Sequence, residues 1–289
     1  YYTQPEPISV ADQLKSNVIK VFSAGSAFAA LKEDGSVITW GHLDRGGDSS
    51  LVKNQLLSGV KDIVGTYSSF AALKDDGSVV TWGIGENGGD SSAVSSQLSS
   101  NVKKIVGNHD AFAAIKEDGS VVTWGRSDYG GDSSAVADQL MSNVIKIAGG
   151  IGTSFAALKD DGSVVTWGHP NGGGDSSDVA DQITSGVKDV VANGASFAAI
   201  KENGSVITWG LDQYGGDSSY VAEHLLSGVK EVVANASSFA AIKENGSVVT
   251  WGHPQFGGYS ATVADQLSSG VKKVFASGSA FAALKDDGS

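Results

Sequence analysis

A histidine beside a carboxylate is the pairing in this sequence that could carry out acid–base chemistry. The chain contains five histidines, and His109 is followed directly by an aspartate, Asp110. A carboxylate can orient an imidazole as a general base, and Ser69 or Thr66, one repeat unit away, would then be the group that loses its proton. Polar pairs on exposed links are nevertheless the ordinary case in proteins. We therefore interpret His109 and Asp110 as a solvent-facing pair and predict no catalytic residue.

Metal binding is the second chemistry that these residue types could support. His42, His169 and His253 lie in separate parts of the chain, so they would form a site only if the fold brought them together. Five aspartates recur in Gly-Gly-Asp-Ser-Ser stretches at 46–50, 88–92, 130–134, 173–177 and 215–219. Each stretch offers one carboxylate, whereas calcium takes about six to eight oxygen ligands. We interpret these residues as caps of the short segments that follow, and predict no metal ion.

Other catalytic and cofactor signatures are missing from the sequence. It has no His-X-X-X-His pair, no nucleophile elbow, and no glycine-rich loop that combines a lysine with a following helix, as a phosphate site requires. The fifth histidine, His224, lies where other units have Gln. The chain is therefore predicted not to be an enzyme and to use no cofactor.

The elements that must position these side chains are copies of one hairpin unit. Residues 27–41 read Ala-Phe-Ala-Ala-Leu-Lys-Glu-Asp-Gly-Ser-Val-Ile-Thr-Trp-Gly, and close copies begin near residues 69, 111, 154, 196, 238 and 280. In each copy a short apolar run, an Asp-Gly or Asn-Gly pair that accepts positive φ, and a β-branched run predict two antiparallel strands. A further strand precedes them, as at residues 60–64. The six tryptophans are 42 or 43 residues apart, a period typical of propeller blades or solenoid coils.

The two ends of the chain favour a propeller over a solenoid. The last copy stops at Ser289, before its Val-Val-Thr strand, and residues 1–3 resemble the start of that strand. We expect residues 1–3 to complete the seventh unit and close the ring, which leaves no unpaired sheet edge there. The predicted fold is an all-β, seven-bladed β-propeller with three-stranded blades, closed by an N-terminal strand. Residues 1–289 are predicted to be a single domain, in which the repeated Ala pairs, Phe and Trp pack between blades.

Charge and composition exclude several classes of partner. Lys and Arg number 20 against 32 Asp and Glu, which gives a net charge of -12 and argues against nucleic-acid binding. No stretch approaches the roughly 18 apolar residues of a membrane span. The absence of cysteine excludes disulfides and thiolate chemistry.

Because the chain starts at Tyr1 and Met141 is its only methionine, we expect a processed product. A secreted location is favoured without the compartment being determined, and we expect a monomer.

The units differ mainly at one end of the predicted blades. In an up-and-down blade the link between the first and second strands and the loop after the third strand lie at the same end, opposite the Asp-Gly hairpins. Rigidly held aromatic, Arg and His side chains suit binding because they lose little entropy on contact. We predict that this end binds a partner through Tyr67, His109, Arg126, Tyr129, His169, Tyr214, His253 and Phe256. The alternative is that these loops have drifted without constraint.

The repeat resembles a known family. Val-Lys-Lys-Ile at 102–105, followed by Phe-Ala-Ala-Ile-Lys-Glu-Asp-Gly-Ser-Val-Val-Thr-Trp-Gly at 112–125, resembles the repeat of the regulator of chromosome condensation family. The short period, the Ser-Gly-Val-Lys lead-in and the chain start at the third strand are most similar to the β-lactamase inhibitor protein II branch. The resemblance covers the whole chain. It implies seven blades, a closing strand from the N-terminus, and a partner-binding face at the varied end.

The predicted function is a non-catalytic binding module that presents a protein-interaction surface on one propeller face. The partner is an unknown protein. A lectin is one alternative, because Tyr, Trp and His around shallow pockets can stack on sugar rings. A structural repeat that acts as a spacer or assembly unit is the other. The opposite face, with its Lys-Asp-Asp-Gly and related turns, is interpreted as a solubilising surface.

Overall fold

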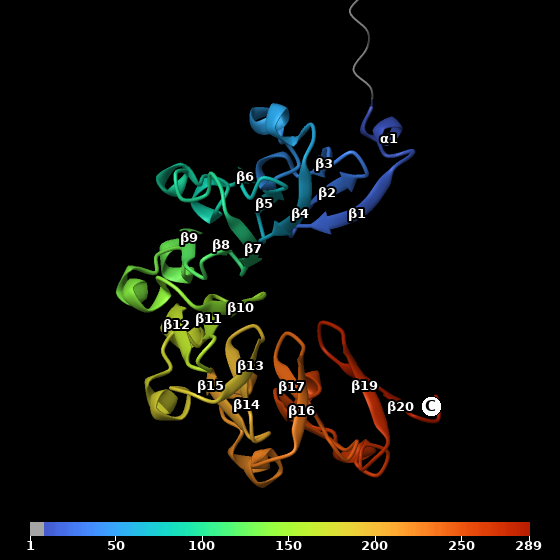
Figure 1. Cartoon of the computed structure of the whole chain (residues 1–289). Helices are drawn as coiled ribbons and strands as arrows, with labels where there is room; N and C mark the ends of the chain where they lie inside the picture. The colour runs from blue at the N-terminus through green and yellow to red at the C-terminus, as the bar shows by residue number, and fades with distance from the viewer. Residues whose placement is uncertain (1–8) are drawn as a thin grey trace, which may run out of the picture. The chain divides into compact units, whose positions relative to one another are not determined.

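The computed structural model describes residues 9–289, whose regular structure is short antiparallel strands joined by turns and brief helices (Figure 1). In this part of the chain the strands form seven sheets, six of three strands and one of two. The three-stranded sheets are β1 (Val18–Ser23), β2 (Ala27–Lys32) and β3 (Val37–Gly41); β4 (Val60–Gly65), β5 (Ser69–Lys74) and β6 (Val79–Gly83); β7 (Val102–Gly107), β8 (Ala111–Lys116) and β9 (Val121–Gly125); β10 (Val144–Ala148), β11 (Ser154–Lys159) and β12 (Val164–Gly168); β13 (Val187–Ala192), β14 (Ser196–Lys201) and β15 (Val206–Gly210); β16 (Val229–Ala234), β17 (Ser238–Lys243) and β18 (Val248–Gly252).

The seventh sheet pairs β19 (Val271–Ala276) with β20 (Phe281–Lys285). The predictions of an all-β fold and of three-stranded antiparallel units are therefore confirmed. The strand that we predicted for residues 1–3 lies outside the described residues.

The chain divides into two compact units at the turn between β8 and β9. Unit 1 holds the described residues up to Glu117 together with Val122–Arg126, and it contains the first three sheets apart from that turn. Unit 2 holds Asp118–Val121 and Ser127–Ser289, with the other four sheets. The single-domain organisation stays a prediction.

Between one sheet and the next, the chain usually forms two short 3₁₀ helices. The first follows the third strand: η1 (Leu43–Arg45), η3 (Gly85–Asn87), η5 (Ser127–Tyr129), η7 (Pro170–Gly172), η9 (Asp212–Tyr214) and η11 (Pro254–Phe256). The second begins at the last serine of Asp-Ser-Ser, or after Tyr259-Ser260 in the sixth case: η2 (Ser50–Leu56), η4 (Ser92–Val94), η6 (Ser134–Leu140), η8 (Ser177–Gln182), η10 (Ser219–Leu225) and η12 (Ala261–Val263). The single α-helix of the described residues is α1 (Val10–Gln13). None of these helices has the length and apolar character needed to cross a bilayer.

The turn between the second and third strands follows one pattern, seen at residues 74–78. Gly77 donates to the carbonyl of Lys74 (3.0 Å), and Lys74 donates to that of Ser78 (2.9 Å). Gly77 has φ +77°, whereas Asp76 is outside the left-handed region. This is a type I turn followed by a left-handed glycine. The prediction of positive φ is therefore confirmed for the glycine and wrong for the aspartate, whose Oδ1 instead accepts from the backbone N–H (2.9 Å) and hydroxyl (2.6 Å) of Ser78.

Neighbouring sheets of a unit approach so closely that their backbones touch. The N–H of Val60, which opens β4, donates to the carbonyl of Gly35 in the preceding sheet (3.0 Å). A Cβ added at Gly35 would come within 2.6 Å of Gly59 N, so no side chain fits there. The same bond recurs between Val102 and Gly77, Val144 and Gly119, Val187 and Gly162, Val229 and Gly204, and Val271 and Gly246.

Small and aromatic residues fill the space between sheets in layers. Ala29 and Leu31 of β2 pack against Phe70 and Ala72 of β5, and all four are at most 2% exposed. The alanines leave room for the neighbouring sheet, and the phenylalanine ring fills the remaining gap. The predicted packing role of the Ala pairs and Phe is confirmed for the second to the sixth sheets, whereas Phe28 of the first sheet is 42% exposed and Ala282 and Ala283 of the last are exposed.

The tryptophan at the end of the third strand bonds its own sheet to the repeat that precedes it. The ring of Trp82 stacks on Phe70 with centroids 5.2 Å apart, and its Nε1–H donates to the carbonyl of Gly46 (3.0 Å). Both partners are buried, so the bond satisfies a carbonyl that water cannot reach. The same pair of contacts recurs at Trp124, Trp167, Trp209 and Trp251, with Gly88, Gly130, Gly173 and Gly215 as acceptors.

We predict that Trp82→Phe destabilises the protein by about 2–3 kcal/mol, because it leaves the Gly46 carbonyl buried without a donor and removes part of a packed ring. Urea unfolding followed by fluorescence and far-UV circular dichroism measures the change. Tyr259→Phe, at an aromatic side chain that is mostly exposed, is the matched control and is expected to change stability by less than about 0.5 kcal/mol. Equal midpoints for the two variants would contradict the role given to the indole.

Acid sensitivity is expected to arise partly in the hairpin turns. The Ser78 hydroxyl, and after it the Ser78 N–H and Lys74, hold the pKa of Asp76 below its usual value of 3.8, and Asp34 and Asp161 are held down in the same way. A lowered pKa in the folded state gives stability that is present above the usual pKa and is lost as the pH falls through the folded value.

Asp34→Asn/Asp76→Asn/Asp161→Asn should therefore lose less stability on acidification below about pH 4 than the unmodified protein. Asn203 and Asn245 already close the equivalent turns with an amide oxygen, at 2.9 and 3.0 Å from the next serine N–H, so the turn tolerates the change. Urea midpoints measured from pH 7 to pH 3 provide the comparison. Parallel pH curves for the two proteins would show that the turns contribute nothing.

Candidate binding surface

The varied residues lie at one end of each sheet. In the first sheet Ala27 pairs with Gly41, and in the second Ser69 pairs with Gly83, so the start of the middle strand lies beside the end of the third strand. The link between the first and second strands and the loop after the third strand therefore meet at this end within each sheet. We call these links and loops the varied end. The prediction of which loops share an end is confirmed.

In unit 1 the varied end carries a continuous row of side chains. The rings of Tyr67 and His109 stack with centroids 4.8 Å apart and planes 14° apart. The guanidinium carbon of Arg45 lies 5.1 Å above the Tyr67 ring, which is a cation–π distance. On the other side, His109 Nδ1 is 3.0 Å and Arg126 Nη1 is 3.8 Å from Asp110 Oδ2. We call these five residues the arginine row.

Backbone hydrogen bonds fix this row across successive sheets. Gly25 donates to the carbonyl of Tyr67 (2.8 Å), and Tyr67 donates to the carbonyl of His109 (2.8 Å). The three residues belong to the links of the first, second and third sheets. A Cβ added at Gly25 would come within 2.6 Å of Tyr67 Cδ2 and 2.7 Å of Tyr67 O, so the glycine makes room for both the ring and the backbone carbonyl. The row is therefore ordered by the main chain before any partner arrives.

The interpretation of His109 and Asp110 as a solvent-facing pair is wrong for the aspartate. The Asp110 side chain is 6% exposed, whereas that of His109 is 40% exposed. Asn108 folds back beneath the link, and its Oδ1 accepts from the N–H groups of Asp110 (3.1 Å) and Ala111 (2.8 Å). The carbonyl of Asp110 also accepts from Arg126 N (3.0 Å). These bonds turn the carboxylate inward, where it orients His109 from below.

The hydroxyls of Ser69 and Thr66, the groups that His109 could have deprotonated, form hydrogen bonds with backbone groups. Ser69 Oγ donates to the carbonyl of Ile84 (2.9 Å), and Thr66 Oγ1 accepts from Ser69 N (3.1 Å) and lies 3.3 Å from Ser69 O. Both hydroxyls therefore serve to fold the link. Among the described residues, no group of three or more His, Asp or Glu side chains is placed to hold a metal ion.

In unit 2 the predicted site residues form local groups. Tyr129 meets His169 edge-on, with ring centroids 6.3 Å apart. His253 lies against Phe256 with centroids 4.6 Å apart and a 41° tilt, and 37% of Phe256 is exposed. The carbonyl of Tyr214 accepts from Asn193 Nδ2 (2.6 Å). In the equivalent bond of the next sheet, Asn235 Nδ2 donates to Phe256 O (2.6 Å). The binding role of the eight residues predicted from the sequence, in unit 1 and unit 2, remains a prediction.

The sequence placed Arg45 in one of the varied loops, but it was not among the predicted binding residues. It stands at the end of η1, separated from Tyr67 by the whole of η2 and β4, so no local pattern connects the two. One signal was available. The chain contains two arginines, Arg45 and Arg126, and both belong to the arginine row.

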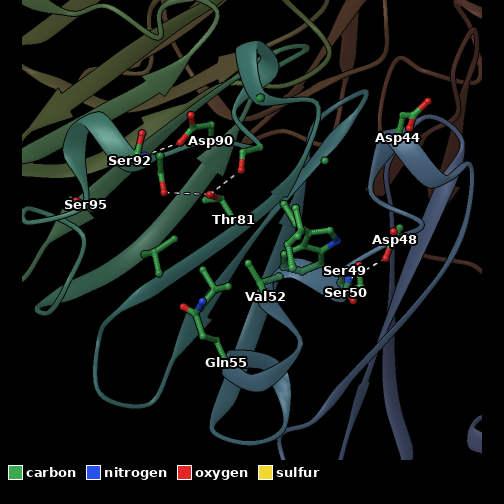
Figure 2. A pocket seen from close by; sticks show the side chains of 18 of the residues that line it. Asp44, Asp48, Ser49, Ser50, Val52, Gln55, Thr81, Asp90, Ser92 and Ser95 are labelled. Atoms are coloured by element: carbon green, nitrogen blue, oxygen red, sulfur yellow. Dashed lines mark hydrogen bonds between the residues drawn. The ribbon is translucent and has the colours of Figure 1, made fainter.

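A groove of about 620 Å³, lined by polar and apolar residues, lies in unit 1 between η2 and the outer strand β6 (Figure 2). Several of its polar groups bond one another. Asp48 Oδ1 accepts from Ser50 N (2.8 Å), and Asp90 Oδ1 accepts from Ser92 N (2.9 Å). Thr81 Oγ1 donates to the carbonyl of Gly89 (3.0 Å). The pKa of each aspartate is lowered by the backbone N–H of the serine two residues on, Ser50 or Ser92, and then by the hydroxyl of that serine.

These contacts recur in the other sheets and have a structural role. Asp132, Asp175 and Asp217 accept from the serine two residues on, and Thr39, Thr166, Thr208 and Thr250 bond the glycine carbonyl of their own loop. Each carboxylate closes the turn that starts a 3₁₀ helix. The aspartates of the Gly-Gly-Asp-Ser-Ser stretches thus have the structural role that we predicted, although they close the turn before each helix and the N-cap serines make no side-chain capping bond. The arginine row is the better candidate for binding.

Comparison with known proteins identifies the fold. No family model and no curated protein matches the chain. Among solved structures, yeast RCC1 (Prp20) bound to Kap60 is similar with a TM-score of 0.52 and 17% identity, over 96% of this chain and 83% of that one. Prp20p from Saccharomyces cerevisiae, studied for its binding to Gsp1p and histones, has a TM-score of 0.51 and 19% identity, over 85% and 74%. Human WBSCR16 has a TM-score of 0.50 and 15% identity, over 83% and 77%. These structures are RCC1-like propellers, so the seven small sheets have the β-propeller fold.

We predict that Gly25→Ala displaces the Tyr67 ring from its stack on His109 and weakens the Gly25–Tyr67 backbone bond without unfolding the protein, because the new methyl group meets both the ring edge (2.6 Å) and the carbonyl oxygen of Tyr67 (2.7 Å). Proton NMR of the His109 ring reports the loss of the Tyr67 ring current. Gly278→Ala, at the equivalent link of the last sheet, is the matched control because an added Cβ meets nothing within 4 Å there. An unchanged His109 signal in Gly25→Ala would contradict the described fit.

Proposed function

We propose that the protein is a non-catalytic binding module that recognises another protein through the varied end. The observation that carries this proposal is the arginine row, in which Tyr67 is 46% exposed and the side chains of His109 and Arg126 are 40% and 45% exposed. Partly exposed aromatic and arginine side chains that are held in place by a scaffold are the usual anchors of protein interfaces. The proposal extends to Tyr129, His169, Tyr214, His253 and Phe256 of unit 2.

Pre-ordering supports binding over drift. The links of three successive sheets are joined by backbone hydrogen bonds, so the rings of Tyr67 and His109 lose little freedom on contact with a partner. In the solved propellers compared above, Prp20p was studied for its binding to Gsp1p and histones, and yeast RCC1 was seen bound to Kap60. Protein binding is thus a function for which this fold is used.

We further infer that the repeat is nearest in type to β-lactamase inhibitor protein II. The support is the short period and the Ser-Gly-Val-Lys lead-in to the first strand, as at residues 58–61. Gly59 of that lead-in has φ +71° and its carbonyl accepts from Asp75 N, so the motif closes the hairpin end of the sheet. The module is proposed to act as a monomer.

We expect Tyr67→Ala/His109→Ala to fold normally and to lose most of the capture of the partner from an extract of the producing organism, because it removes the stacked rings. Quantitative mass spectrometry of the captured proteins provides the measurement. Glu33→Ala/Asp75→Ala, on exposed residues of the hairpin turns, is the control and should capture as the unmodified protein does.

Two results would contradict the proposal. Equal capture by the two variants would exclude the varied end of unit 1 as the binding surface. Binding to a glycan array that depends on Tyr67, together with no captured protein, would favour a lectin.

A further inference from the structure

We propose that the arginine row is a receptor for carboxylate side chains, so that the partner presents an acidic segment to the varied end of unit 1. This inference rests on the proposed function, whose partner chemistry it specifies. The first observation is the distribution of arginine. The chain has 20 basic residues in total, but both of its arginines are in this row.

The geometry of Arg45 suits a carboxylate. Its guanidinium carbon lies over the Tyr67 ring, 5.1 Å from the ring centroid, so the ring holds the cation in place. A guanidinium presents a fork of N–H donors, which a carboxylate matches with two parallel hydrogen bonds. A lysine can also lie over a ring, as Lys20 does over Phe22 (4.4 Å), but its ammonium group has no such fork.

The charges around the row favour an anion. Asp110 is the acidic member, and it is buried while the side chains of His109 and Arg126 are partly exposed. Asp44, the residue before Arg45, lines the groove of Figure 2. Within the row two arginines stand against one buried aspartate, which pairs with Arg126, on a chain whose net charge is -12; the exposed Asp44 and Asp128 flank Arg45 and Arg126 in the sequence. At physiological salt, repulsion from the other carboxylates is screened beyond about 8 Å, so the charges within the row determine whether an anion is attracted when it makes contact.

Tyr67 and His109 add an apolar component to the site. Their stacked rings lie between the two arginines, so a partner segment that reaches both guanidinium groups must cross the rings. Contact with the rings removes water from the charged hydrogen bonds, which strengthens them. An acidic segment of a protein, with carboxylates spaced along an extended chain, has the chemistry that fits this row.

The test uses the full chain, labelled with ¹⁵N, and a short acetylated oligoglutamate peptide as the probe. We expect the peptide to shift the Arg45 and Arg126 Nε–H signals and the backbone signals of Tyr67 and His109, with an affinity that falls as salt rises. Arg45→Gln/Arg126→Gln should weaken the binding by about tenfold, because each substitution removes charge-assisted hydrogen bonds. Arg45→Lys, which keeps the charge and loses the fork of donors, should weaken it less.

Lys53→Gln/Lys61→Gln is the matched control, because it removes the same amount of charge from exposed positions of unit 1. Equal loss of binding in this control, or shifts spread over the lysines, would overturn the proposal and show unspecific attraction. Tighter competition by inorganic phosphate than by oligoglutamate would also overturn it, in favour of a phosphate site. Oligoglutamine and oligolysine peptides should give no shifts at the row.

The outcome can be separated from that of the proposed function. Loss of partner capture in Tyr67→Ala/His109→Ala, combined with full capture by Arg45→Gln/Arg126→Gln, would retain the protein-binding function and reject the acidic partner. Arginine-dependent oligoglutamate binding without any captured partner would support the carboxylate site and count against the proposed function.

Discussion

The buried hydrogen bond from a tryptophan indole to a glycine carbonyl of the preceding repeat is the contact on which the rest of this structure depends. It joins Trp82 to Gly46, and it recurs at four more tryptophans of the described residues. A buried carbonyl without a donor is costly, so each repeat needs the indole of the next one. The bond also holds the sheets at a separation where alanine and glycine are the residues that fit, as at Gly35, whose added Cβ would meet Gly59 N at 2.6 Å. Packing and hydrogen bonding thus impose the same spacing.

That spacing orders the surface as well as the core. Because neighbouring sheets are so close, the links at the varied end bond one another directly, from Gly25 to Tyr67 and from Tyr67 to His109. Because the backbone of these links is held by hydrogen bonds, the side chains that project from them are held in position as well, and Tyr67 and His109 stack as a result. A rigid repeat therefore supplies a binding surface without long loops. Variation at a few positions changes the chemistry of the surface while the contacts beneath it stay the same.

The polar residues divide into two classes by what satisfies them. In the groove of Figure 2, Asp48 and Asp90 bond the serine N–H two residues on, and the same bond is made in other sheets, so these carboxylates are part of the fold. In the arginine row, side chains from three successive sheets lie next to one another, and the guanidinium groups of Arg45 and Arg126 lie at the two sides of the stacked rings. Repetition marks the first class as structural, and the concentration of arginine marks the second as a surface of its own.

The amino-acid sequence by itself determined the strands, the hairpin turns and the packing roles of Ala, Phe and Trp. These features depend on short-range patterns, and each pattern is repeated several times along the chain. It also indicated that Tyr67, His109 and Arg126 belong to the varied end, since the end of a strand at which a loop lies follows from strand order. Only the tertiary structure decided that Arg45 covers the Tyr67 ring and that Asp110 is buried beneath His109. Both facts depend on how closely one sheet approaches the next, and residues in different repeats carry no local signal of the distance between them.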